Sequence, residues 1–154
     1  MVLLLRKMTF SHNKNFLMRK KIVAGNWKMN KVLDEAVALT SELVNMAKDE
    51  VRNDAKIILC PPAIYLTTIQ KYIEDAPNFA LAAQNCSDKV SGAFTGEISA
   101  QMLQSIGVQY VLIGHSERRQ YFNETNALLA EKVNTALAYG VSPCLLYTSD
   151  AADE

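Results

Sequence analysis

Residues 22–30 read IVAGNWKMN, a short apolar run that is followed at once by glycine and polar residues. A compact apolar run of this kind is expected for a strand buried on both faces of a parallel sheet. A dinucleotide-binding fold would place the motif G-x-G-x-x-G directly after its first strand. Residues 25–30 do not match that motif, and no Walker-type glycine loop occurs elsewhere. The segment therefore predicts a parallel sheet and disfavours a nucleotide-binding one.

Similar apolar runs return along the chain at a regular spacing. Further candidate strands begin near residues 57, 79, 110 and 141, which gives a βα repeat of roughly 30 residues. Right-handed crossovers of that length build either a doubly wound sheet or a (β/α)₈ barrel. Because the chain lacks the glycine-rich loop, the doubly wound sheet is disfavoured. Amphipathic patterns predict three helices. The first covers residues 33–47, and the second follows Pro61-Pro62 with the apolar stripe Ile64, Ile69, Tyr72 and Ile73. The third has the apolar stripe Leu128, Leu129, Val133 and Leu137 and ends at Gly140.

The composition is that of one soluble globular domain. Of the 154 residues, 49% are hydrophobic and 21% are charged. Sixteen basic residues balance sixteen acidic ones, so no net charge directs the chain to nucleic acid or to a membrane surface. Cys60, Cys86 and Cys144 lack a paired spacing such as CxxC, which favours reduced core thiols over disulfides or metal ligands.

The N-terminal residues follow no clear period. Val2 to Leu5 form an apolar run shorter than a secretory h-region, and no small-residue cleavage site follows. We interpret residues 1–17 as an upstream extension or mis-called start without ordered structure, and Met18 as the natural first residue. A targeting segment is the alternative, because the stretch is basic and lacks Asp and Glu.

Polar side chains follow three of the predicted strands at the point where each strand ends. Asn26 and Lys28 follow the first strand, Gln84 and Asn85 follow the third, and residues 115–117 (His-Ser-Glu) follow the fourth. In barrels the carboxyl-terminal ends of the strands carry catalysis. The sequence therefore predicts one shared pocket at this end of the sheet.

Four segments then resemble, in order and spacing, those of the triosephosphate isomerase family. They are residues 23–30 (VAGNWKMN), 83–85 (AQN), 96–99 (GEIS) and 113–119 (IGHSERR). The resemblance covers residues 18–144 and implies the N-terminal half of a (β/α)₈ barrel, with four βα units and the start of strand five, because a full barrel needs about 250 residues. Residues 145–154 resemble nothing in the family, and we interpret them as foreign sequence after a truncated gene fragment.

The resemblance implies a cytoplasmic enzyme of glycolysis and gluconeogenesis that needs no metal and no cofactor. Such an enzyme interconverts dihydroxyacetone phosphate and D-glyceraldehyde 3-phosphate through an enediol(ate). Lys28 would be the cation near the substrate's oxygen and phosphate, with Asn26 as a neighbouring hydrogen-bond donor. His115 would be the neutral imidazole that polarises the carbonyl, and Glu117 the catalytic carboxylate close to Lys28. Without the resemblance, Lys28 would be interpreted as a solvated loop lysine and His115 as a core histidine. Glu117 would be interpreted as an acidic residue in the first turn of a helix.

The resemblance also implies partners and missing parts. In the family, residues 86–97 correspond to a loop that enters the second subunit of a homodimer, and Thr95 matches the residue that approaches the partner's Asn-Lys pair. The family's general base, a glutamate after strand six, and its phosphate-binding amides after strands seven and eight match nothing in this sequence. We therefore expect a phosphorylated triose as substrate and an inactive chain when it is alone. The alternative is a non-catalytic half-barrel that recruits a protein through its edge strands.

Overall fold

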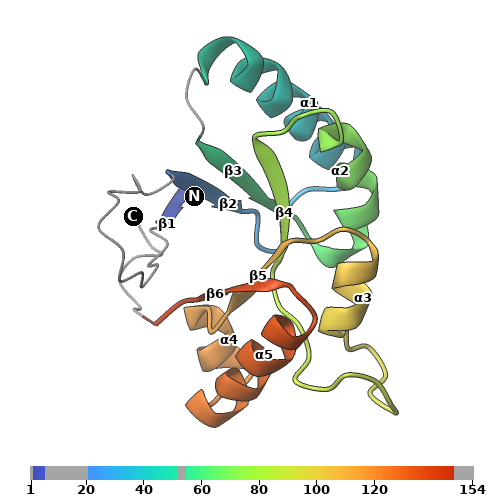
Figure 1. Cartoon of the computed structure of the whole chain (residues 1–154), viewed down its shortest axis with the longest axis vertical. Coiled ribbons are helices and arrows are strands. Elements are labelled where there is room, and N and C mark those ends of the chain that lie inside the picture. The colour runs from blue at the N-terminus through green and yellow to red at the C-terminus, as the bar shows by residue number, and fades with distance from the viewer. Residues whose placement is uncertain (1, 6–20, 52–54, 148–154) are drawn as a thin grey trace, which may run out of the picture.

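The computed structural model describes residues 2–5, 21–51 and 55–147, which form a single curled sheet with the strand order β1-β2-β3-β4-β5-β6. Strands β2 to β6 are parallel, and β1 is antiparallel to β2. The helices lie outside the curve of the sheet (Figure 1). This is half of a (β/α)₈ barrel, as predicted. The strands are β1 Val2–Leu5, β2 Ile22–Asn26, β3 Lys56–Cys60, β4 Phe79–Ala83, β5 Tyr110–Ile113 and β6 Ser142–Leu145.

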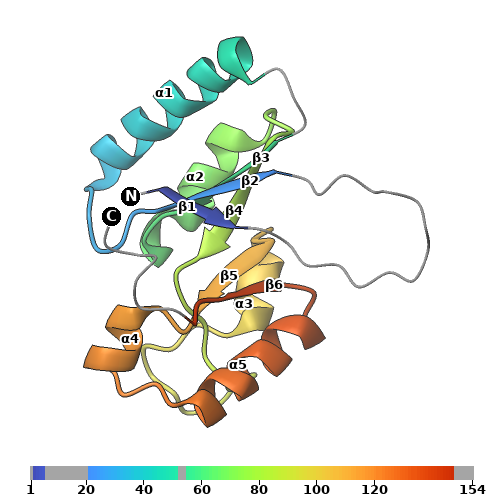
Figure 2. The same ribbon diagram turned by 90° about the vertical axis from the view of Figure 1, so that its left-hand side faces the viewer.

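Helical segments connect each parallel strand to the next, which confirms the four predicted βα units. The helix after β4 has only six residues, because a loop over residues 84–99 takes up most of that connection. Figure 2 shows α1 and α5 running along the outside of the sheet. The helices are α1 Leu33–Glu50, the 3₁₀ helix η1 Ala63–Tyr65, α2 Leu66–Ile73, α3 Ala100–Ser105, α4 Ser116–Tyr121 and α5 Asn126–Ala138.

Both faces of the sheet are buried, because successive side chains of a strand point to opposite sides. In β4, Leu81 and Ala83 belong to the core between sheet and helices, whereas Ala80 and Ala82 belong to the inner core of the curve. This two-sided burial explains why the strands read as continuous apolar runs. The outer core includes Leu59, Leu66, Ile69, Leu103, Val111, Ile113 and Leu129, and the inner core includes Ile22, Ala24, Ile58, Cys60 and Leu112.

Two predicted apolar stripes differ from the observed ones. After Pro61-Pro62 the chain first forms one 3₁₀ turn, so Ile64 is 78% exposed and the buried stripe of α2 starts at Leu66. The tighter 3₁₀ turn shifts the helical period relative to the predicted one. In α5 the buried positions include Leu129 and Lys132, whereas Leu137 is 59% exposed. The buried face of α5 thus includes a lysine that the predicted apolar stripe did not contain.

The N-terminal extension was predicted to lack ordered structure, but Val2–Leu5 form strand β1 along the outer edge of β2. An apolar run of this length suits a strand, and the edge of β2 offers unpaired backbone groups. At the other end, Leu145 belongs to β6, and the Leu146 amide donates to the Ile113 carbonyl at 2.8 Å. These two residues continue the fold instead of opening a separate tail. Residues 1, 6–20 and 148–154 lie outside the described residues, among them Met18, the predicted natural first residue.

All three cysteines are free, and Cys60 and Cys86 are buried, whereas Cys144 is only partly buried. Burial raises the pKa of the Cys60 thiol to about 12, with a smaller contribution from Cys144. Burial also raises the pKa values of Cys86 and Cys144 to about 11. These thiols are therefore protonated at neutral pH. Within the described parts of the chain, none of the helices has the length and hydrophobicity that a membrane crossing requires.

Candidate active site

The loop after β2 holds Lys28 in a fixed and strained backbone conformation. Lys28 has a φ of 53°, in the left-handed region that non-glycine residues rarely adopt. Its amide donates to Asn26 Oδ1 at 3.0 Å, and Asn30 Nδ2 donates to the Trp27 carbonyl at 2.9 Å. Strain of this kind costs about 1–3 kcal/mol and persists only where neighbouring groups fix the chain. Both asparagine side chains contribute to that fixing.

Gln84, at the end of β4, ties the Lys28 loop to the neighbouring strands. Its Nε2 donates to the Lys28 carbonyl at 2.9 Å and to the Cys60 carbonyl at 2.8 Å. Cys60 also accepts the amide of Trp27 at 3.1 Å. The sequence places Gln84 at this end of the sheet but indicates no role for it. The structure shows that it supports the backbone of the lysine.

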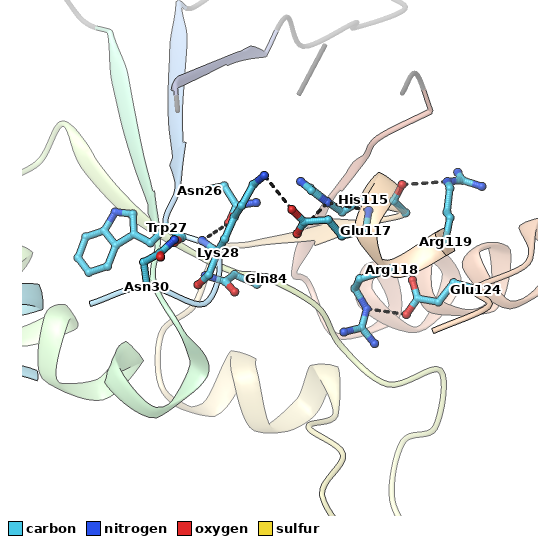
Figure 3. A network of polar contacts seen from close by, with 11 residues as sticks. Asn26, Trp27, Lys28, Asn30, Gln84, His115, Glu117, Arg118, Arg119 and Glu124 are labelled. Carbon is cyan, nitrogen blue, oxygen red and sulfur yellow. Dashed lines mark hydrogen bonds and ion pairs between the residues drawn. The ribbon is translucent and has the colours of Figure 1, made fainter. Parts of the chain in front are cut away.

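Lys28 and Glu117 meet across the end of the sheet. Lys28 Nζ lies 2.7 Å from Glu117 Oε1, and Figure 3 shows the two side chains pointing toward each other. Glu117 stands in the first turn of α4, where a carboxylate suits the helix dipole. The two side chains are 29% and 42% exposed, so water weakens the pair and its net stabilisation is about 0–1 kcal/mol. The contact therefore serves mainly to orient the ammonium group.

His115 caps α4 and is almost completely buried. Its Nδ1 accepts the Glu117 amide at 3.2 Å, and the same nitrogen lies 3.6 Å from Glu117 Oε2. Because Nδ1 accepts a hydrogen bond, the neutral ring carries its proton on Nε2. Nε2 is buried and makes no hydrogen bond to any residue that the structure describes. A buried donor of this kind is suited to a bound ligand.

Two consecutive arginines anchor α4 on the side away from Lys28. Arg119 donates to the Gly114 carbonyl at 2.9 Å, to Asn126 Oδ1 at 2.7 Å and to the Leu146 carbonyl at 3.2 Å. Arg118 Nε donates to Glu124 Oε1 at 2.7 Å. Both arginines belong to the segment quoted from the sequence, but their partners could not be read from it.

Similarity to known proteins identifies the family of this chain. The family model described as Triosephosphate isomerase matches residues 21–148. The chain belongs to the triosephosphate isomerase family. Among similar curated proteins, the triosephosphate isomerase of Cytophaga hutchinsonii is 59% identical over 126 residues, or 82% of this chain and 49% of the relative. The triosephosphate isomerase of Bacteroides fragilis is 50% identical, again over 82% of this chain and 49% of the relative. That of Clostridium beijerinckii is 45% identical over 83% of this chain and 50% of the relative.

The chain thus spans about half the length of the curated triosephosphate isomerases that it matches. This share agrees with the half-barrel fold. The match also extends beyond residue 144, where the sequence resemblance was placed to end. Residues 145–148 therefore belong to the matched region.

The structure places four of the five predicted site residues at one end of the sheet. They are Asn26, Lys28, His115 and Glu117, and the Lys28–Glu117 and His115–Glu117 contacts connect three of them directly. Thr95 lies elsewhere, exposed on the loop between β4 and α3, which extends away from the sheet (Figure 1). Within the described ranges, no group of three or more His, Cys, Asp or Glu residues is arranged to hold a metal ion.

Proposed function

We propose that this chain carries half of the active site of an isomerase that interconverts dihydroxyacetone phosphate and D-glyceraldehyde 3-phosphate. The observation that carries the proposal is the buried, unpartnered Nε2 of His115 beside the Lys28–Glu117 pair. An N–H at this position can donate to a carbonyl oxygen, where negative charge develops when the neighbouring carbon loses a proton. The names of the curated relatives support the same reaction.

The other residues have supporting roles in this proposal. Lys28 supplies a fixed positive charge for the substrate's oxygen and phosphate, and Asn26 binds substrate beside it. Asn26 also holds the Lys28 amide, so it helps to place the cation. Glu117 orients the Lys28 ammonium and, through its own amide, the imidazole of His115. Together these groups would polarise and bind the substrate without metal or cofactor.

A general base is the component that this cluster does not supply. Glu117 Oε2 lies 3.6 Å from His115 Nδ1, but Glu117 Oε1 is engaged by Lys28 at 2.7 Å. By family resemblance, the base is a glutamate after strand six of the full barrel. A positioned base contributes about 10²–10⁴-fold to such a reaction. We therefore propose that the 154-residue chain is inactive alone.

The family resemblance extends the proposal to assembly and location. We propose that residues 86–97, with Thr95, contact a second subunit in a homodimer of the intact enzyme. Phe94 and Val90 of this loop are 45% and 42% exposed, and their apolar surface would be available for such a contact. Cytoplasmic glycolysis and gluconeogenesis are the corresponding setting.

The test is to combine this chain with the separately expressed C-terminal half of the Cytophaga hutchinsonii relative. Isomerase turnover is measured with a coupled assay on protein free of host enzyme. Activity that appears on mixing and is lost with His115→Gln would support the proposal. A stable complex of the two halves without turnover would instead favour the non-catalytic interaction protein. That alternative is supported by the outer edge of β6, which pairs with no strand among the described residues.

A further inference from the structure

A buried ion cluster lies on the side of α4 away from Lys28. Glu124, between α4 and α5, is 5% exposed, and Lys132 of α5 is 3% exposed. Glu124 Oε1 accepts from Lys132 Nζ at 2.6 Å and from Arg118 Nε at 2.7 Å. Lys132 Nζ also donates to Asn85 Oδ1 at 2.8 Å. The Glu124 carboxylate thus connects α4 with α5, and Lys132 extends the cluster to the loop after β4.

The charges in this cluster depend on one another. Burial raises the pKa of Glu124, but the hydrogen bonds from Lys132 and Arg118 outweigh it and hold that pKa below its ordinary value. The carboxylate is therefore ionised at neutral pH. A buried ion pair gains little net stability over a well-packed apolar pair, because desolvation offsets the attraction. A role in orienting its neighbours would account for charged residues at these positions.

Helix α4 needs such an external support. It has only six residues, and a helix this short is not stable on its own in water. The side chains of Arg118 and Arg119 point from the helix toward different partners, as Figure 3 shows. Arg119 binds the Gly114 carbonyl, whereas Arg118 binds Glu124 and lies 4.5 Å above the Phe122 ring. Two anchors in different directions fix the rotation of the helix about its axis.

We propose that Glu124 is a positioning residue, which holds Arg118 and thereby fixes the orientation of α4, Glu117 and His115. The link to the site is short, because Glu117 directly precedes Arg118 and its amide binds His115 Nδ1. If α4 rotates, that hydrogen bond lengthens, and the imidazole loses its preference for carrying the proton on Nε2. The inference rests on the proposed function for the importance of His115, but its geometry can be tested without catalysis.

The test compares two variants that each remove one cation from the same carboxylate. Arg118→Met breaks the anchor of α4 and leaves Glu124 paired with Lys132, whereas Lys132→Met leaves the anchor in place. The chain has two histidines, His12 and His115. Both variants are made in a His12→Gln background, so that only His115 gives a histidine signal. The ratio of its two neutral tautomers is measured by NMR of ¹⁵N-histidine-labelled full-length protein. We expect Arg118→Met to change the ratio by roughly two- to tenfold, as for loss of one ordinary hydrogen bond, and Lys132→Met to leave it unchanged.

Equal changes in the two variants would overturn the proposal. An unchanged ratio in Arg118→Met with a native amide spectrum would also overturn it. If Arg118→Met does not fold, Arg118→Lys takes its place, because lysine keeps a cation opposite Glu124 but loses the planar guanidinium. A smaller change in the same direction is then expected, and an unchanged ratio again contradicts the proposal. Failure of the mixed halves to show isomerase activity would count against the proposed function and would not alter the tautomer comparison.

Discussion

Gly114 lies where the end of β5, helix α4 and the end of β6 come together. Its φ is +77°, and an added Cβ would lie 2.9 Å from Arg119 Nη2, 2.9 Å from the Leu146 carbonyl oxygen and 3.2 Å from Leu129 Cδ1. The Arg119 side chain is held by three hydrogen bonds and cannot move aside without losing them. We therefore expect Gly114→Ala to lower the free energy of unfolding by about 2–4 kcal/mol, measured by urea denaturation.

Gly25→Ala is the matched control for this substitution. No heavy atom lies within 4 Å of a Cβ added at Gly25, and its φ is outside the left-handed region. A change within about 1 kcal/mol is expected there. If the two substitutions lowered the free energy of unfolding by similar amounts, the contacts around Gly114 would not constrain the fold.

The buried thiols provide a second test on single residues. Because burial raises the pKa of Cys60 to about 12 and those of Cys86 and Cys144 to about 11, few thiolates exist at pH 8 in the folded chain. In the unfolded chain the ordinary pKa is about 8.5. We expect reaction with a disulfide reagent at pH 8 to be at least about 10²-fold slower in native buffer than in urea. A thiol that reacts equally fast in both would contradict the described burial.

The same shifts predict how stability depends on alkaline pH. The folded chain keeps protons that the unfolded chain loses above about pH 8.5. The contribution of the three thiols is therefore complete below that pH and is lost as the pH rises toward 11 and beyond. Replacing Cys60 by alanine should reduce this dependence, as measured by urea unfolding at several pH values. An unchanged dependence would exclude the Cys60 contribution.

Among the secondary-structure elements, α4 and α5 are connected by a charge pair that should respond to acid. The pKa of Glu124 lies below its ordinary value, so its contribution to stability is present above about pH 4.3 and is lost as the pH falls through the folded-state pKa. Glu124→Gln is expected to lower stability at pH 7 by roughly 3 kcal/mol, because the buried Lys132 ammonium loses its charged partner. Its unfolding free energy should then depend less on pH between 7 and 3.

Asp88→Asn is the control for the acid experiment. The hydrogen bond from Lys89 lowers the pKa of Asp88, but this pair lies at the surface, with the Lys89 side chain 52% exposed. A smaller loss of stability at pH 7 is therefore expected than for Glu124→Gln. If both variants lose an equally small amount of unfolding free energy, the buried pair does not hold α4 and α5 together.

Strand β1 covers the edge of β2 that would otherwise be unpaired. Deleting residues 1–17 removes these backbone partners, so the β2 amides that face β1 should exchange faster with solvent. Self-association should also increase, because β2 then becomes the edge strand. Hydrogen exchange and sedimentation velocity at about 10⁻⁵ M measure the two effects. Amides of β5, which does not adjoin β1, serve as the internal control, and unchanged exchange in β2 would refute the pairing.

Most of the strands and helices could be predicted because their apolar residues recur at local spacings. Strand β1 could not, since a four-residue apolar run becomes a strand only beside an available edge. The site was predicted in part for a similar reason. Asn26, Lys28, His115 and Glu117 follow strand ends directly, and parallel strands bring those ends together. Gln84, Glu124 and Lys132 act through partners that are distant in sequence or belong to the backbone, and no local pattern reports such contacts.

At the scale of the whole molecule, the chain is expected to show no isomerase turnover above background when it is assayed alone. In the proposed function, His115 and Lys28 polarise a carbonyl, but Glu117 is bound to Lys28 and cannot serve freely as the base. The measurement is a coupled assay with His115→Gln as the control. Turnover that clearly exceeds background and disappears in the variant would show that half of the site is sufficient.

The order of the strands has a consequence for synthesis on the ribosome. Each parallel strand pairs with the strand translated just before it, so the sheet can grow while the chain is still emerging, with contacts that span about one βα unit. The polar cluster is different, because Lys28 is made early and its partner Glu117 is made only after β5. Until residue 117 has been synthesised, the Lys28 ammonium therefore cannot form this ion pair. The scaffold can form strand by strand, whereas the ion pair of the site forms only after α4 has left the exit tunnel.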